Sequence, residues 1–210
     1  MLAMLLLSTA AAGLNPLSQP VQRVDVGSGN NIVLHVPTDD AIMEAVMQKG
    51  HKMALEAGEE LYDQVMEEFV TSNIGPAYWA QLWPSALALG RDILQRPSLF
   101  PSERQQPVLE LGCGLGLASI CAAKAGAIRV IATDIEPWAL DFAAANAAEN
   151  EIAVGASRFS AQRLDWADPA NSSATSEAQS YGTVLAADVV CASAGDRTRR
   201  LLGSAASRSF

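Results

Sequence analysis

Short apolar runs alternate with longer stretches of helical periodicity through the second half of this chain. Residues 108–111, 129–133 and 183–190 are rich in valine, leucine, isoleucine and alanine, as buried strands are. Between them, residues 117–125 and 137–150 are alanine-rich and carry apolar side chains at helical spacing. Strands that alternate with helices in this way are typical of an α/β fold with a parallel sheet.

The first third of the chain has a different pattern. Residues 21–37 alternate apolar and polar side chains on either side of a glycine- and asparagine-rich loop, which predicts a β-hairpin. Thr38 can cap a helix, and apolar positions at roughly helical spacing continue from there to Phe69. We expect Gly50 and Gly58 to break this helical stretch into pieces.

Less regular segments separate these elements. The aromatic segment 76–89 leads into a helix that ends near Gln95, and the prolines of residues 96–107 indicate a loop. Residues 156–159 are a weak strand candidate, and the serine- and alanine-rich residues 165–179 predict a polar loop.

The first fourteen residues are apolar and uncharged. They lack the basic region of a signal peptide and are too short to cross a bilayer, so we expect a cytoplasmic or organellar protein. The chain then divides into an unstructured or targeting segment (1–22), a hairpin and helical extension (23–75), an α/β domain (76–191) and an atypical tail (192–210).

Composition and charge indicate which kinds of binding partner the chain favours. The 210 residues suit one α/β domain with an extension, and half of them are apolar. A formal charge of −9 disfavours a nucleic-acid partner, because phosphate binding needs a basic face, and makes a basic protein partner easier to bind. The acidic residues of the helical extension are interpreted as a solvated helix face, with a substrate-docking surface as the alternative. The three cysteines have no metal-ligand spacing and are read as reduced intracellular thiols.

The first strand of the alternating half ends in a glycine-rich turn. Residues 108–116 read V-L-E-L-G-C-G-L-G, and glycine allows a ligand to approach the backbone without an intervening Cβ. Asp134 ends the next apolar run, where a carboxylate can bind ribose hydroxyls. These features predict a ligand that contains a nucleoside. A dinucleotide fold requires glycine at position 117, where this chain has Leu117, so the spacing argues against NAD.

Two segments resemble one family of enzymes. The stretch E-L-G-C-G-L-G resembles motif I of the seven-strand, S-adenosylmethionine-dependent methyltransferases. Residues 78–86, Y-W-A-Q-L-W-P-S-A, resemble the segment before motif I in the methyltransferase-like protein-lysine methyltransferases, lysine methyltransferase family 16. The resemblance covers roughly residues 76–191. It implies a Rossmann-like seven-strand sheet, S-adenosylmethionine as cofactor and a lysine of a protein substrate as methyl acceptor.

The resemblance also implies roles for single residues. Asp188 matches the carboxylate that faces the incoming lysine. The residues that match cofactor-binding positions are Gly112, Cys113 and Gly114 under the methionine part, Asp134 at the ribose, Trp166 beside the adenine, and Trp83 and Ala187 around the pocket. Cys191 stands where the family has a tyrosine, and a thiol cannot supply the phenol that helps to position the amine. A catalytically impaired cofactor- or partner-binding module is therefore the alternative reading.

The end of the chain departs from the family. The family has three more strands after the one at residues 183–190, whereas residues 192–210 are rich in serine, alanine and arginine and lack strand-like runs. We therefore expect the sheet to be truncated after its fourth strand. Methyl transfer needs no metal, and neither nucleic acid nor a membrane is expected as a partner. A small-molecule methyltransferase shares motif I but is disfavoured by the tryptophan segment.

Overall fold

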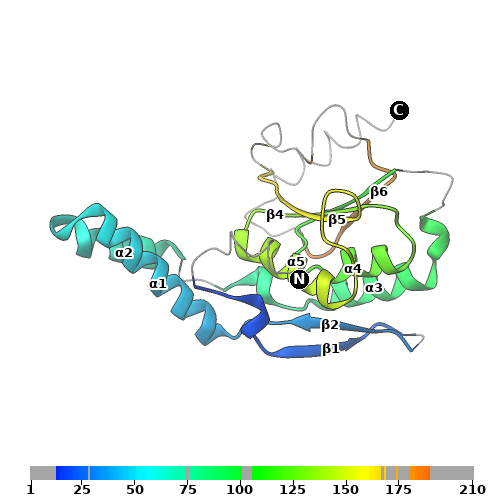
Figure 1. The fold of residues 1–210 in the computed structure, drawn as a ribbon, viewed down its shortest axis with the longest axis horizontal. Helices are drawn as coiled ribbons and strands as arrows, with labels where there is room; N and C mark the ends of the chain where they lie inside the picture. Colours follow the sequence, from blue (N-terminus) through cyan, green and yellow to red (C-terminus); the bar gives the residue numbers. More distant parts are fainter. Residues whose placement is uncertain are drawn as a thin grey trace.

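The computed structural model describes residues 13–27, 29–73, 76–100, 106–166, 168, 174 and 180–189. A parallel sheet with its helices forms the body, a hairpin lies along one side, and a pair of helices projects away from it (Figure 1). The strands are β1 Val21–Asp25, β2 Asn31–His35, β3 Val108–Leu111, β4 Val130–Asp134, β5 Phe159–Arg163 and β6 Thr183–Ala186. The helices are α1 Asp39–Ala57, α2 Tyr62–Asn73, α3 Pro84–Gln95, α4 Leu117–Lys124 and α5 Pro137–Glu149.

The four later strands form a parallel sheet in the order β5-β4-β3-β6. The predicted α/β class is therefore confirmed, with α4 connecting β3 to β4 and α5 connecting β4 to β5. Strand order reverses at β3, because β4 and β5 extend the sheet on one side of it and β6 on the other. In open α/β sheets, ligands bind beyond the carboxyl ends of the strands at such a reversal.

Two strands differ from their predictions. The strand expected at residues 156–159 is β5, which begins at Phe159 and pairs with β4 from Val130↔Phe159 to Asp134↔Arg163. Most of its side chains are half-buried or exposed, so the sequence shows no continuous apolar run there. The last strand was expected to be buried, but in β6 only Leu185 is. Among the described strands β6 pairs only with β3.

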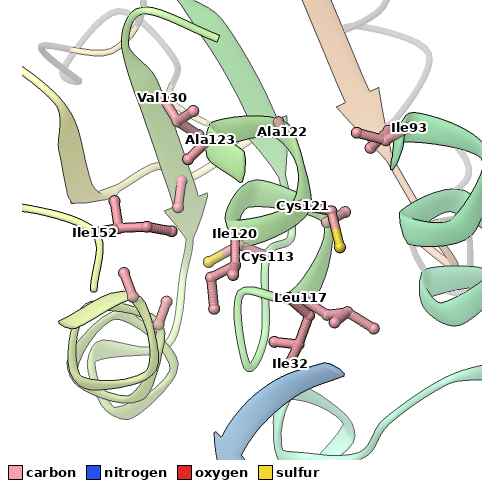
Figure 2. Close-up of a cluster of buried hydrophobic side chains, with 14 of the residues drawn as sticks. Ile32, Ile93, Cys113, Leu117, Ile120, Cys121, Ala122, Ala123, Val130 and Ile152 are labelled. Atoms are coloured by element: carbon pink, nitrogen blue, oxygen red, sulfur yellow. The ribbon is translucent and has the colours of Figure 1, made fainter. Parts of the chain in front are cut away.

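The core is built around α4, whose residues from Leu117 to Ala123 are all buried. Small side chains allow this helix to lie close to the elements on every side of it. Figure 2 shows Ile32 of β2 and Ile93 of α3 near α4, together with Val130 of β4. The hairpin that the sequence predicted at residues 21–37 is therefore part of the main hydrophobic core.

The α1–α2 pair shows why Gly50 does not break a helix as expected. α1 runs without interruption through Gly50, where a Cβ would lie 2.9 Å from Cδ1 of Phe69 and 3.1 Å from Sδ of Met66. The glycine lets the two helices pack closely, and this packing outweighs its poor helix propensity. Gly58 does end α1, with a φ of 96° that other residues rarely adopt.

Several predictions concern residues outside the described part of the chain. They include the apolar segment at residues 1–12, the family tyrosine position at Cys191 and the tail from residue 192 onward. The truncated sheet, the four-part division of the chain and the targeting segment therefore stay predictions. No helix among the described residues is long and apolar enough to cross a membrane.

The close approach of α5 to the glycine-rich turn can be tested at Gly116. A Cβ there would lie 3.0 Å from Cβ and 3.1 Å from Cα of Ala143, and φ is 84°. We expect Gly116→Ala to lower the free energy of unfolding by about 3 kcal/mol, combining positive-φ strain with overpacking. Gly126→Ala is the control, because φ is 108° but nothing lies within 4 Å. It should cost about 1 kcal/mol. Urea unfolding measures both, and equal losses would contradict the packing argument.

Candidate active site

A cleft of about 770 Å³ opens beyond the carboxyl ends of the four parallel strands. Its walls come from the segments that follow β3, β4, β5 and β6, and from the residues before α3 and on the near ends of α1 and α2. All eight site residues predicted from the sequence line it: Trp83, Gly112, Cys113, Gly114, Asp134, Trp166, Ala187 and Asp188. The volume is in the range of small-molecule and cofactor sites.

The glycine-rich turn after β3 forms the floor of the cleft. Gly112, Gly114 and Gly116 have φ values of 61°, 49° and 84°, a region that disfavours any residue with a Cβ. At Gly114 a Cβ would lie only 2.8 Å from the backbone oxygen of Trp79. The turn is tied to β4 because the Cys113 amide donates to the Thr133 carbonyl at 2.8 Å. The glycines of the turn therefore allow both its positive-φ conformation and its close approach to Trp79.

Asp134 lies at the end of β4, directly beside this turn. One carboxylate oxygen accepts from the Gly114 amide at 3.0 Å, and the other accepts from the Glu136 amide at 3.1 Å. A carboxylate has about four lone-pair positions, so further hydrogen bonds can be accepted. The side chain is only 8% exposed, and this burial raises the pKa of its carboxyl. The turn and the carboxylate that the sequence paired are thus in direct contact.

Glu110 is a site residue that the sequence analysis did not assign. It precedes the glycine turn, lines the cleft and is buried. Its carboxylate accepts a 2.9 Å hydrogen bond from the Ser119 amide in the first turn of α4. Desolvation raises its pKa to about 7, against the lowering effect of the Ser119 hydrogen bonds. The signal in the sequence was its position, since it is an acidic residue inside the apolar run 108–111.

Asp188 lies at the opposite wall, after β6, where its φ of 52° places it in the left-handed region. Its carboxylate accepts a hydrogen bond from the hydroxyl of Ser85, which belongs to the first turn of α3. The carboxylate is therefore held near the positive end of a helix, a favourable position for an anion. Asp188 is exposed, so an incoming polar group can reach it.

Four tryptophans line the cleft, and two of them, Trp83 and Trp166, were predicted as site residues. The indole N–H of Trp83 donates to the Tyr78 carbonyl at 2.9 Å, which fixes the ring next to the start of α3. Trp166 follows β5, and its ring carbon Cζ2 would lie 3.7 Å from a Cβ on Gly112. The same Cβ on Gly112 would lie 2.8 Å from Cγ1 of Val189, so Val189 covers part of the turn. The sequence analysis did not assign Val189.

The charge of the cleft is one-sided. Five carboxylates lie among its lining residues, while no lysine, arginine or histidine does so among the described residues. They are Glu110, Asp134, Glu136, Asp165 and Asp188. Such a lining favours a cationic ligand and opposes a phosphate-bearing one.

Comparison with known families agrees with this geometry. The sequence profile of a family described as lysine methyltransferase matches residues 46–195, which is most of the chain and includes all eight predicted site residues. The chain belongs to the lysine methyltransferase family. This methyltransferase match begins within α1, so the family region includes part of the helical extension as well as the sheet.

Curated relatives of this chain are similar to it over a short region. It is 46% identical over 65 residues to the electron transfer flavoprotein beta subunit lysine methyltransferase of Xenopus laevis, covering 31% of this chain and 25% of that protein. The human protein of the same description is 44% identical over 62 residues, 30% of this chain and 22% of that protein. The ribosomal protein L11 methyltransferase of Thermotoga maritima is 43% identical over 47 residues, 22% of this chain and 18% of that protein.

The matched segments thus span about a quarter or less of the length of these relatives. A solved structure of a proposed RNA methyltransferase from Pyrococcus horikoshii aligns with 45% of this chain and 46% of that chain. The sequence identity is 22% and the TM-score is 0.34. That structural likeness is too low to add to the argument.

The raised pKa of Glu110 predicts how the free energy of unfolding depends on pH. Its pKa is about 7 in the folded chain against 4.5 for the unperturbed group, so folding favours the protonated form. Its contribution to stability is therefore complete below pH 4.5 and is lost as pH rises to about 7, a change of about 3 kcal/mol.

The Glu110→Gln variant isolates this contribution, because glutamine can still accept from the Ser119 amide but does not titrate. Urea unfolding from pH 4.5 to 9 should show the stability of the wild type falling relative to the variant, with the difference levelling off at about one pH unit above the folded pKa. A difference that does not change with pH would show that Glu110 has the same pKa in the folded and the unfolded chain.

Proposed function

We propose that this protein transfers a methyl group from S-adenosylmethionine to a lysine side chain of a protein substrate. The observation that carries the proposal is the cleft at the carboxyl ends of the strands, where the glycine turn and Asp134 are joined by a 3.0 Å hydrogen bond. Membership of the lysine methyltransferase family supports lysine as the acceptor.

The residues of the cleft fit this cofactor. S-adenosylmethionine carries a nucleoside, an amino-acid ammonium group and a sulfonium, which supplies the methyl group with a good leaving group. Asp134 has carboxylate lone pairs left for the ribose hydroxyls, and the backbone at Gly112 and Gly114 admits the amino-acid part. The five lining carboxylates suit its positive charges. Trp166 offers an aromatic face for the adenine.

The acceptor side of the cleft is formed around Asp188. A lysine amine must be neutral to attack. The neighbouring carboxylates favour its ammonium form, whereas the positive charge of a bound sulfonium would favour loss of the proton to solvent. The carboxylate of Asp188, held by Ser85, can accept a hydrogen bond from that amine and orient its lone pair. The lysine nitrogen then forms a bond to the methyl carbon as the carbon–sulfur bond breaks and sulfur keeps the electron pair. The main contribution of the chain is positioning, which can supply a large effective concentration.

A protein substrate is favoured over a small molecule by the relatives. The Xenopus laevis and human relatives are described as methyltransferases of a protein subunit, and the Thermotoga maritima relative as one of a ribosomal protein. The exposed carboxylate of Asp188 is also accessible to a lysine carried by a large partner.

Substitutions on the two sides of the cleft should differ in their effects on cofactor binding and on methyl transfer. Asp134→Ala should weaken binding of S-adenosylhomocysteine at least about 100-fold, because two charged hydrogen bonds to ribose are lost. Asp188→Ala should leave that affinity within about 3-fold of the wild type but lower methyl transfer at least about 100-fold. Calorimetric titration measures binding, and transfer of labelled methyl into protein measures turnover. Equal affinity in the wild type and Asp134→Ala would refute the cofactor site.

The labelled experiment also separates the remaining functions. Purified protein is incubated with methyl-labelled S-adenosylmethionine and a cell extract, and label is counted in protein and in small molecules. Label in protein lysine supports the proposal, whereas label in metabolites indicates a small-molecule methyltransferase. Cofactor binding without any transfer indicates the impaired module that Cys191 suggests.

A further inference from the structure

The N-terminal hairpin is attached to the body through an unusual set of hydrogen bonds. Strand β2 pairs with β1 along one edge, and its other edge faces α5. On that side the Val33 and His35 amides donate to the side-chain oxygens of Asn150 and Asn146, at 3.0 and 2.7 Å. In return, the side-chain nitrogen of Asn150 donates to the Val33 carbonyl at 2.7 Å, and the side-chain nitrogen of Asn146 donates to the His35 carbonyl at 3.4 Å.

The two asparagines therefore replace a neighbouring strand. Asn146 lies in the last turn of α5 and Asn150 is the residue that caps it. Four residues correspond to an advance of about 6 Å along a helix, and the partners of the two asparagines are two residues apart on a strand, an advance of about 6.7 Å. This near match lets each carboxamide donate to and accept from the same β2 residue. The edge of the hairpin is thereby satisfied without a further strand.

Asn146 makes one bond that Asn150 does not. Its side-chain nitrogen also donates to the backbone carbonyl of Leu115 at 3.0 Å, inside the glycine-rich turn. Asn146 is fully buried, and Leu115 is a lining residue of the cleft. The side-chain orientation is determined by its surroundings, because the reverse orientation would direct the oxygen at two carbonyls. Asn150 instead donates to the Asn146 carbonyl, within its own helix.

We propose that Asn146 is a positioning residue of the cofactor site, which couples the N-terminal hairpin to the glycine-rich turn. The inference rests on the proposed function, because a change in the turn is detected through the affinity for the proposed cofactor. Loss of the Asn146 side chain leaves the buried Leu115 carbonyl without this donor, and the turn between Gly114 and Gly116 is then free to shift. The coupling is reciprocal, so cofactor binding also stabilises the attachment of β2.

The matched pair Asn146→Ala and Asn150→Ala tests this directly. Both variants remove a side-chain clamp on β2, so both should lower the free energy of unfolding, which urea titration measures. Only Asn146→Ala removes the bond to the turn. Calorimetric titration of folded protein with S-adenosylhomocysteine should show at least a 10-fold loss of affinity for Asn146→Ala and less than a 3-fold loss for Asn150→Ala. Equal losses would overturn the positioning role.

A measurement on the wild type keeps the test decisive if a variant fails to fold. Saturating S-adenosylhomocysteine should slow amide exchange of His35, whose amide is bonded to Asn146, more than that of Val33, whose amide is bonded to Asn150. Equal slowing of the two amides, or slowing of Val33 alone, would overturn the coupling. If the wild type does not bind S-adenosylhomocysteine at all, the proposed function itself fails. Binding with equal effects at Asn146 and Asn150 is a different result, because it contradicts only the positioning role.

Discussion

The hydrogen bond from the Gly114 amide to the Asp134 carboxylate is the interaction on which the site depends. It joins the turn after β3 to the end of β4, and so places the turn and a carboxylate side by side in the cleft. Gly114 makes this bond with a φ of 49° and lies against the Trp79 backbone, where no Cβ fits. The cleft and its neighbouring strand ends are arranged around this contact.

Holding carboxylates in this position has an energetic cost. Burial raises the pKa of both Glu110 and Asp134, which means that the folded chain disfavours their charged forms. Backbone amides offset part of this cost, from Ser119 at Glu110 and from Gly114 and Glu136 at Asp134. A cationic ligand would offset more of it, because positive charge nearby favours the ionised carboxylates. The cofactor proposed above would carry such a positive charge.

The N-terminal extension belongs to the same physical unit. Ile32 of β2 lies in the main core, and Ile42 and Val46 of α1 reach the wall of the cleft. Through Asn146 the hairpin is also bonded to the turn that forms the cleft floor. The extension therefore contributes packing, lining and hydrogen bonds to the site.

The sequence by itself determined the elements with strong local signals. The apolar run of β3, the glycine turn and the acidic end of β4 follow from residue type and spacing, because only glycine tolerates the required backbone and only a carboxylate accepts several hydrogen bonds there. All eight predicted site residues line one cleft, and Trp83, Trp166, Ala187 and Asp188 among them were predicted from the family resemblance and not from local signals. The start of β5, the exposure of β6 and the unbroken α1 were decided by tertiary structure. Each depends on which partner packs against the segment, and partners far apart in the chain leave no periodic signal. The same holds for Asn146, which looks like an ordinary helical residue until folding brings β2 and the glycine turn against it.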